Sequence, residues 1–289
     1  LFDGHDAAIN IMRRILQDTG VEVIHLGHNR SVQEIVDAAI EEDVQGVAVS
    51  SYQGGHIEFF KYLVDLLKER EAPHIKVFGG GGGVIVPEEI RILESYGVTK
   101  IYSPEDGARL GLQGMVNHIV ECLDFSTVKE DGISFEDLAP QSKLRVANLI
   151  TAAEQAKARE DGHLAALRAE MAKKIGGRKT PVIGITGTGG AGKSSLTDEV
   201  ILRILHDLKD IHVAVISCDP SRRKTGGALL GDRIRMNVIG NPRLYLRSLA
   251  TRQSPSEIPA VLPDAVAALK AAGFDLIIAE TAGIGQGDS

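Results

Sequence analysis

Short apolar, β-branched runs alternate with helical periods along this 289-residue chain, and this alternation is the strongest constraint on its fold. In the amino-terminal part the apolar runs are VEVIHLG (21–27), VQGVAVSS (44–51), IKVFGG (75–80) and VTKIY (98–102). The helical periods between them cover 31–43, 56–71, 87–96 and 105–123. Near-continuous apolar strands joined by helices are typical of a parallel sheet covered on both faces. The pattern therefore predicts a doubly wound α/β domain over residues 1–125, with its first strand truncated at Leu1.

A second α/β unit is predicted over residues 181–289. Its expected strands are PVIGIT (181–186), IHVAVISCD (211–219) and FDLIIAET (274–281), and its expected helices cover 193–208 and about 256–272. Residues 126–180 begin as a loop and then become strongly helical with alternating charge. A solvent-exposed helix is typical of such charge patterning, so we interpret 126–180 as a helical linker.

Composition excludes several classes of function. The formal net charge is −7, no long basic run occurs and aromatic residues make up 4%, so neither nucleic acid nor a membrane surface is an expected partner. The two cysteines, Cys122 and Cys218, are far apart and predict neither a disulfide framework nor a zinc site. No apolar run approaches the length of a spanning helix and no signal peptide opens the chain, so we expect a cytoplasmic protein.

The segment from Gly187 to Ser194 satisfies the pattern G-x-x-x-x-G-K-[ST] between an apolar strand and a helix. This context indicates a phosphate loop, whose backbone N–H groups surround phosphate oxygens. Lys193 is predicted to reach the β- and γ-phosphates as a catalytic residue, and the Ser194 hydroxyl to bind Mg²⁺. The predicted nucleotide-binding residues are Gly189, Gly190, Ala191, Gly192, Lys193, Ser194 and Ser195.

The same glycines allow a second interpretation. Gly187-x-Gly189-x-x-Gly192 also fits the dinucleotide fingerprint, with Asp219 as the acid that binds the ribose. Lys193 favours a nucleoside triphosphate, because a dinucleotide site needs no lysine at that helix start. A dinucleotide site and a merely structural glycine turn both stay open at this point.

Acidic residues end two further strands of the second unit. Asp219 ends one, and Glu280 followed by Thr281 ends the other. The carboxyl ends of parallel strands meet at one edge of a sheet, beside a bound phosphate, where Mg²⁺ ligands are needed. Between these strands, residues 226–236 read as a mobile segment whose two arginines, Arg233 and Arg235, are suited to stabilise phosphate charge. A solvated loop is the alternative for this segment.

Two long motifs, CDPSRRKTGGALLGDRIRM and ETAGIGQGDS, resemble the G-domain of metallochaperone GTPases that serve cobalamin-dependent acyl-CoA mutases. The resemblance implies GTP rather than ATP, with Arg235 on the nucleotide and Glu280 as a catalytic acid. It also implies a Mg²⁺ site made of Ser194, Asp219, Asp232, Glu280 and Thr281. The guanine-reading N-K-x-D segment is not in this chain, so guanine selectivity is implied by the resemblance alone.

Near the amino end, Asp3 and His5 precede a helical run in a polar loop. A lone histidine is usually structural or exposed, but a carboxylate two residues away can orient the ring as it does in metal sites. The segment is similar to the D-x-H-x-x-G motif of cobalamin-binding domains, with Ala8 in place of the last glycine. This likeness implies that His5 is the lower cobalt ligand and that Asp3 supports it.

Two further signatures of cobalamin-binding domains follow predicted strands. Ser50-Ser51-Tyr52 is similar to the S-x-L motif, with Tyr52 for the leucine, and the run Gly79 to Gly83 is similar to the G-G motif. The likeness implies a flavodoxin-like (Rossmann-like) domain. The residues it places on the cofactor are Ser50, Tyr52, Gly79, Gly80 and Gly81. A flexible turn is the alternative for the glycines.

The domain order, cobalamin domain, helical linker and partial P-loop G-domain, resembles the fused isobutyryl-CoA mutase family. The resemblance implies an isomerase that uses adenosylcobalamin, GTP and Mg²⁺, with a GTPase that gates cofactor loading. It further implies a homodimer, an acyl-CoA substrate bound in a carboxyl-terminal barrel outside this chain, and a partner that delivers adenosylcobalamin. The alternatives are a stand-alone GTPase or cobalamin-delivery module, and a mutase for another acyl-CoA such as methylmalonyl- or pivalyl-CoA. We therefore expect an amino-terminal fragment.

Overall fold

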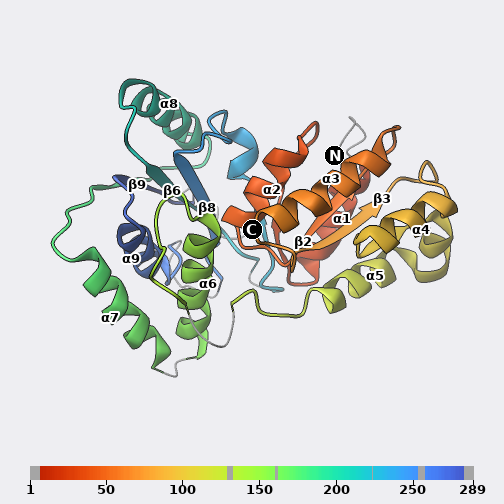
Figure 1. The fold of residues 1–289 in the computed structure, drawn as a ribbon, viewed down its shortest axis with the longest axis horizontal. Coiled ribbons are helices and arrows are strands. Elements are labelled where there is room, and N and C mark those ends of the chain that lie inside the picture. Colours follow the sequence, from red (N-terminus) through yellow and green to blue (C-terminus); the bar gives the residue numbers. More distant parts are fainter. Residues whose placement is uncertain (1–6, 129–132, 160–161, 223, 253–257, 283–289) are drawn as a thin grey trace.

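The computed structural model describes residues 7–128, 133–159, 162–222, 224–252 and 258–282. In Figure 1 an amino-terminal half, coloured red to yellow, lies beside a carboxyl-terminal half, coloured green to blue. The helices are α1 (Ala7–Asp18), α2 (Val32–Glu41), α3 (His56–Glu69), α4 (Pro87–Tyr96), α5 (Pro104–Cys122), α6 (Lys143–Arg159), α7 (His163–Ile175), α8 (Lys193–Asp207) and α9 (Leu262–Ala272). The strands are β1 (Glu22–Ile24), β2 (Gly46–Ser50), β3 (Lys76–Gly80), β4 (Lys100–Tyr102), β5 (Val182–Ile185), β6 (Val213–Asp219), β7 (Ala228–Leu230), β8 (Leu244–Ala250) and β9 (Leu276–Glu280).

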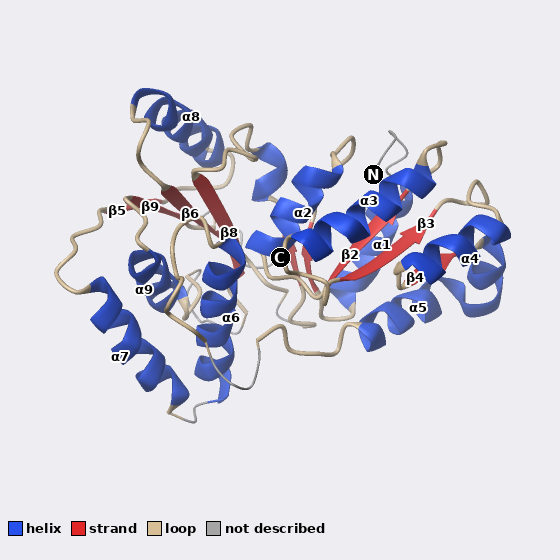
Figure 2. Ribbon diagram, in the orientation of Figure 1, coloured by secondary structure: helices blue, strands red, loops and turns tan. Residues whose placement is uncertain are grey.

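Each half contains a parallel sheet, as Figure 2 shows, and this confirms the predicted α/β class. The strand order is β2-β3-β4 in the first half and β5-β9-β6-β8 in the second. A third, two-stranded pairing joins β1 of the first half to β7 of the second, in parallel. The two halves therefore share backbone hydrogen bonds as well as side-chain contacts.

Helix starts in the amino-terminal half follow local rules. At Ser31 and Ser103 the serine hydroxyl accepts a backbone N–H three residues on, while Glu34 and Asp106 accept the backbone N–H groups of those serines. Such capping boxes satisfy backbone donors that a helix end leaves open. They fix where α2 and α5 begin, directly after the loops at the carboxyl ends of strands.

Two strands and one helix start differ from the sequence predictions. β7 and β8 were not predicted, because β7 has only three residues and the apolar pattern of β8 is interrupted by Arg247 and Ser248, both buried. The described part of the last helix begins at Leu262 rather than near 256, with Pro263 in its first turn, where a missing N–H costs nothing.

The two helices of the predicted linker pack against the sheet of the carboxyl-terminal half. Leu149 and Ile150 of α6 and Met171 of α7 are buried in the same core cluster as Tyr245 of β8 and Phe274. In this core the helices cover one face of the sheet together with α9.

No helix in the described part of the chain is both long and apolar enough to cross a membrane.

Candidate nucleotide and cobalamin sites

The phosphate loop joins β5 to α8, as the sequence predicts. Gly190 (φ 77°) and Gly192 (φ 80°) adopt the left-handed conformation that favours glycine, so the sequence of the loop matches its backbone geometry. α8 begins at Lys193, and its positive dipole end faces the loop. The Lys193 Nζ donates to the carbonyl oxygens of Gly187 (3.3 Å) and Thr188 (3.2 Å), which holds the ammonium over the loop.

Glu280 joins the phosphate loop to the end of β9. Its carboxylate is buried and accepts hydrogen bonds from the Ser194 hydroxyl (2.6 Å) and the Thr197 hydroxyl (2.9 Å). The register places Glu280 beside Ile185 of β5, immediately before the loop. The predicted metal-binding serine and the predicted catalytic acid are therefore in direct contact. Thr197, whose hydroxyl also donates to the Lys193 carbonyl (2.9 Å), was not singled out from the sequence.

The structure describes the other predicted Mg²⁺ ligands in different detail. Asp219 ends β6 two residues beyond Ser217, which is in register with Glu280. The Thr281 hydroxyl is buried and has no hydrogen-bond partner in the described structure. Asp232 and Arg235 lie on a 3-10 helix, η1 (Asp232–Arg235), whose backbone is described and whose side chains at these two positions are not.

This donor set fits a magnesium ion. Mg²⁺ is usually held by one or two carboxylates together with water and substrate phosphates, not by a cage of protein ligands. A single carboxylate with an adjacent serine hydroxyl and an orphaned threonine hydroxyl meets that description.

The predicted cobalamin residues gather at the carboxyl ends of β2 and β3. Ser50 is in register with Gly80, and the backbone N–H of Ser51 donates to the Gly80 carbonyl (2.9 Å). The glycines here are required by packing: a Cβ on Gly81 would lie 2.3 Å from the Ser51 carbonyl oxygen, and one on Gly79 would lie 2.5 Å from the Phe60 ring. These contacts favour close packing at this edge over a flexible turn.

Two features of this edge fit a polar ligand with an extended tail. The Ser51 hydroxyl is buried without a hydrogen-bond partner among the described residues. The Tyr52 ring lies against Gly82, where a Cβ would be 2.5 Å from Tyr52 Cε1, so the ring forms one wall over the glycine loop. Asp3 and His5, the predicted axial ligand and its support, lie outside the described residues.

His56 and Glu89 connect the loops that follow β2 and β3. The sequence analysis did not single out either residue. His56 Nε2 lies 3.0 Å from the Glu89 carboxylate, and its Nδ1 lies 3.2 Å from the Gln53 carbonyl. The Val86 backbone N–H also donates to Glu89 (3.0 Å), and these hydrogen bonds lower the pKa of the Glu89 carboxyl. The sequence signal for this contact is a histidine and a glutamate that each lie in the first turn of a helix after a glycine-containing loop.

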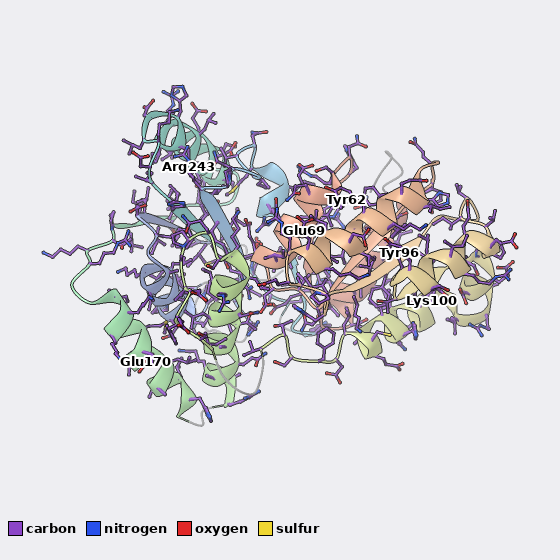
Figure 3. The ribbon with its side chains drawn as sticks, in the orientation of Figure 1. Tyr62, Glu69, Tyr96, Lys100, Glu170 and Arg243 are labelled. Carbon is purple, nitrogen blue, oxygen red and sulfur yellow. The ribbon has the colours of Figure 1, made fainter. Side chains whose placement is uncertain are left out.

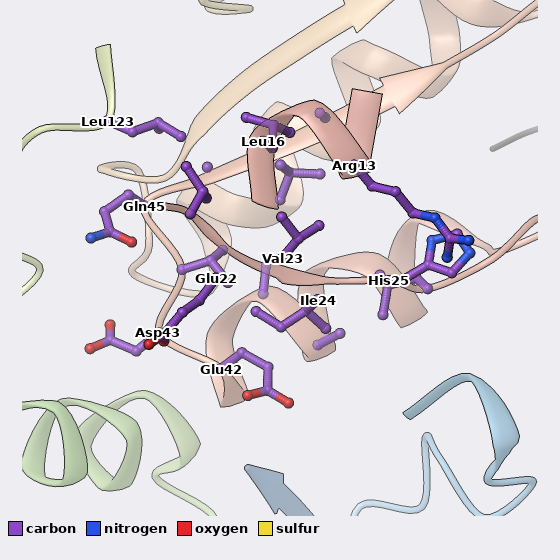
Figure 4. A pocket seen from close by; sticks show the side chains of 18 of the residues that line it. Arg13, Leu16, Glu22, Val23, Ile24, His25, Glu42, Asp43, Gln45 and Leu123 are labelled. Carbon is purple, nitrogen blue, oxygen red and sulfur yellow. The ribbon is translucent and has the colours of Figure 1, made fainter. Parts of the chain in front are cut away.

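A pocket of about 450 Å³ lies between β1 and β2, and its lining includes Val49 and Phe78, which directly precede Ser50 and Gly79. Figure 4 shows apolar side chains of β1 and α1, among them Leu16, Val23 and Ile24, lining it. Glu42 and Asp43 stand at one end. The pocket therefore reaches the contact between the two halves.

The fold and the two sheet edges define a P-loop nucleotide-binding unit joined to a Rossmann-like ligand-binding domain. The profile of the B12 binding domain matches residues 1–108, and that of the methylmalonyl-CoA mutase-associated GTPase MeaB matches residues 146–289. The chain therefore contains a B12-binding domain and a GTPase domain of the MeaB type.

Full-length relatives place the two domains in one family. The chain is 61% identical over 292 residues to the fused isobutyryl-CoA mutase of Geobacillus kaustophilus and 60% identical over 290 residues to that of Cupriavidus metallidurans. Each alignment covers 100% of this chain, which spans only 27% and 26% of those proteins. A solved LAO/AO transport system kinase is similar over 56% of this chain and 46% of its own, at 24% identity and a TM-score of 0.38. The chain belongs to the family of the fused isobutyryl-CoA mutases.

Proposed function

We propose that this chain is the cofactor- and nucleotide-binding part of an adenosylcobalamin-dependent mutase that interconverts isobutyryl-CoA and n-butyryl-CoA. The identity of 61% to a fused isobutyryl-CoA mutase supports this reaction. Because the chain spans 27% of that relative, the acyl-CoA site and the homodimer are carried over from the resemblance. The cytoplasmic location that the sequence predicts is part of this proposal.

The nucleotide site is proposed to bind and hydrolyse GTP, and so to gate cobalamin loading. The observation that carries this proposal is the 2.6 Å hydrogen bond from the Ser194 hydroxyl to Glu280. The proposed ligands of Mg²⁺ are those that the sequence predicts, namely Ser194, Asp219, Asp232, Glu280 and Thr281. The positive charge of Lys193 stabilises the negative charge of the phosphates, and Glu280 orients the Ser194 hydroxyl by accepting its hydrogen bond.

The cobalamin site is proposed at the carboxyl edge of β2 and β3. Ser50, Tyr52 and Gly80 line the slot for the cofactor tail, and His5 supported by Asp3 is the proposed lower ligand of cobalt. Adenosylcobalamin, when bound here, would supply the radical chemistry of the rearrangement. The residues of this chain hold the cofactor and fix its orientation.

Two variants of the complete protein test these assignments separately. Lys193→Ala should reduce Mg²⁺-dependent GTP turnover at least 100-fold and leave the cobalamin absorption spectrum unchanged. His5→Ala should convert the bound cofactor spectrum to one without a histidine ligand and leave GTP turnover unchanged. Unaltered turnover in the first variant contradicts the phosphate-loop assignment, and an unaltered spectrum in the second contradicts the axial-ligand assignment.

A further inference from the structure

A buried ionic cluster joins the two halves of the molecule. Arg233, on η1, has only 2% of its surface exposed. Its Nη1 donates to Glu41 (2.8 Å) and its Nε to Glu42 (3.1 Å), at the end of α2, while its Nη2 donates to the Leu246 carbonyl of β8 (2.6 Å). One guanidinium from the nucleotide half thus satisfies two carboxylates of the cobalamin half.

Every charged group of this cluster has a partner. Lys143 Nζ also donates to Glu41 (2.6 Å), so two cations face two carboxylates. The second oxygen of Glu42 accepts the Ser248 backbone N–H (2.8 Å), and the Tyr245 hydroxyl donates to the Glu41 carbonyl (3.0 Å). Buried ion pairs depend steeply on geometry, because a charge left without its partner keeps its full desolvation penalty. The cluster therefore favours one position of Arg233 strongly over others.

The nucleotide side of the cluster is continuous with the phosphate loop. Arg233 lies between Asp232 and Arg235, which were predicted to bind Mg²⁺ and nucleotide. Just beyond η1, the Asn237 backbone N–H and side-chain amide donate to the carboxylate of Asp198 on α8 (2.9 and 2.8 Å). Because α8 begins at Lys193, a change at the phosphates that moves α8 or η1 moves Arg233.

The cobalamin side of the cluster is continuous with the predicted cofactor slot. Glu41 is the last residue of α2 and Glu42 follows it. β2 begins four residues after Glu42, at Gly46, and runs to Ser50. A second contact is steric: Gly27, in the loop before α2, packs so closely on Ile234 of η1 that a Cβ would lie 2.5 Å from its Cδ1. Displacement of η1 is therefore transmitted to both ends of the β1–α2–β2 unit.

We propose that Arg233, held by Glu41 and Glu42, is the positioning residue that couples the nucleotide state to cobalamin affinity. In one nucleotide state, η1 keeps the Arg233 guanidinium between the carboxylates of Glu41 and Glu42. In the other state, η1 moves the guanidinium away from these carboxylates, so that α2 and β2 shift. The inference rests on the proposed function, since it names the residues through which the GTPase gates cofactor loading. Such coupling is reciprocal: cobalamin must change nucleotide affinity by the same factor.

The test measures cobalamin affinity of the complete protein with and without a non-hydrolysable GTP analogue, and GTP-analogue affinity with and without cobalamin. In the wild type both ratios should be equal and at least about five-fold, the usual lower range of coupling. Arg233→Leu should bring both ratios to one, and Arg233→Lys should restore part of the coupling. Each ligand alone should bind these variants within about three-fold of its wild-type affinity.

Arg247→Leu is the matched control, because Arg247 is also buried (6% exposed) but pairs with Glu154 inside the nucleotide half (3.0 Å). It should keep the wild-type ratios. If Arg233→Leu does not fold, the triple variant Arg233→Leu, Glu41→Gln, Glu42→Gln removes the unpaired carboxylates and should show ratios of one.

Coupling that survives in Arg233→Leu or in the triple variant, a wild-type ratio of one, or equal loss in Arg247→Leu each overturns the proposal while both ligands still bind. Failure of the wild type to bind cobalamin or the GTP analogue overturns the proposed function itself.

Discussion

At the residue scale, the Glu280 carboxylate is the centre of the nucleotide site, because it accepts two hydroxyl hydrogen bonds from α8 while buried at the end of β9. Glu280→Gln keeps the shape of the side chain but replaces one of its two acceptor oxygens with an NH₂ group. That group cannot accept a hydrogen bond from the Ser194 or Thr197 hydroxyl. We expect Mg²⁺-dependent GTP turnover to fall at least 100-fold, or about 3 kcal/mol. Thr197→Val, as a control, removes the hydroxyl that contacts both Glu280 and the Lys193 carbonyl, and it should cost about 1 kcal/mol of folding stability with a smaller loss of turnover. Turnover that is equal in the two variants would contradict this role.

Gly81 is the second residue whose identity the structure explains. A methyl group there would lie 2.3 Å from the Ser51 carbonyl oxygen. At that distance the two atoms overlap, so the backbone would have to move to make room for the methyl group. Gly81→Ala should therefore weaken cobalamin binding at least ten-fold and destabilise the fold by about 1–3 kcal/mol. Gly54→Ala is the control in the neighbouring loop, since a Cβ there meets nothing within 4 Å. Cobalamin titration and urea unfolding of both variants measure the difference, which should vanish if Gly81 lies in a merely flexible turn.

At the scale of elements, the start of α5 depends on a charged cap. Asp106 accepts the Ser103 backbone N–H (3.1 Å) and lies 3.5 Å from Lys100, which is labelled in Figure 3. Burial alone raises the pKa of Asp106, but these hydrogen bonds and the lysine charge outweigh it and lower the pKa below 3.8. The cap therefore stabilises the fold above that pH and loses its effect as the pH falls through the lowered pKa.

Asp106→Asn should consequently cost about 1 kcal/mol near neutral pH. The difference from the wild type should shrink as the pH falls through the lowered pKa of Asp106, because the wild-type carboxylate then becomes protonated. Urea unfolding at several pH values measures this, and Glu105→Gln, which removes an exposed charge of the same turn, serves as the control. A difference that does not change with pH would show that the charge of Asp106 plays no part.

The elements themselves followed from the sequence where the signal was local. Strand–helix alternation predicted the parallel sheets, and the phosphate loop was placed between β5 and α8 by its own residues. β8 was missed because Arg247 interrupts its apolar run, and that buried arginine pairs with Glu154, 93 residues away in the chain. The Arg233–Glu41 pair spans 192 residues, so no local pattern could predict it. The burial of Arg247 in β8 and of Arg233 in η1 thus depends on contacts with residues far away in the sequence.

At the scale of the whole molecule, α6 and α7 stabilise the nucleotide half although their charge pattern predicted a linker. Leu149 and Met171 are fully buried beside Tyr245 and Phe274, so truncating either leaves a cavity in the core. We expect Leu149→Ala and Met171→Ala each to lower the free energy of unfolding by about 2–5 kcal/mol. Leu202→Ala on α8, with 51% of its surface exposed, should change it by less than about 1 kcal/mol. Equal, small effects in urea unfolding of all three variants would mean that these helices only connect the domains, whereas the expected difference makes them part of the GTPase core.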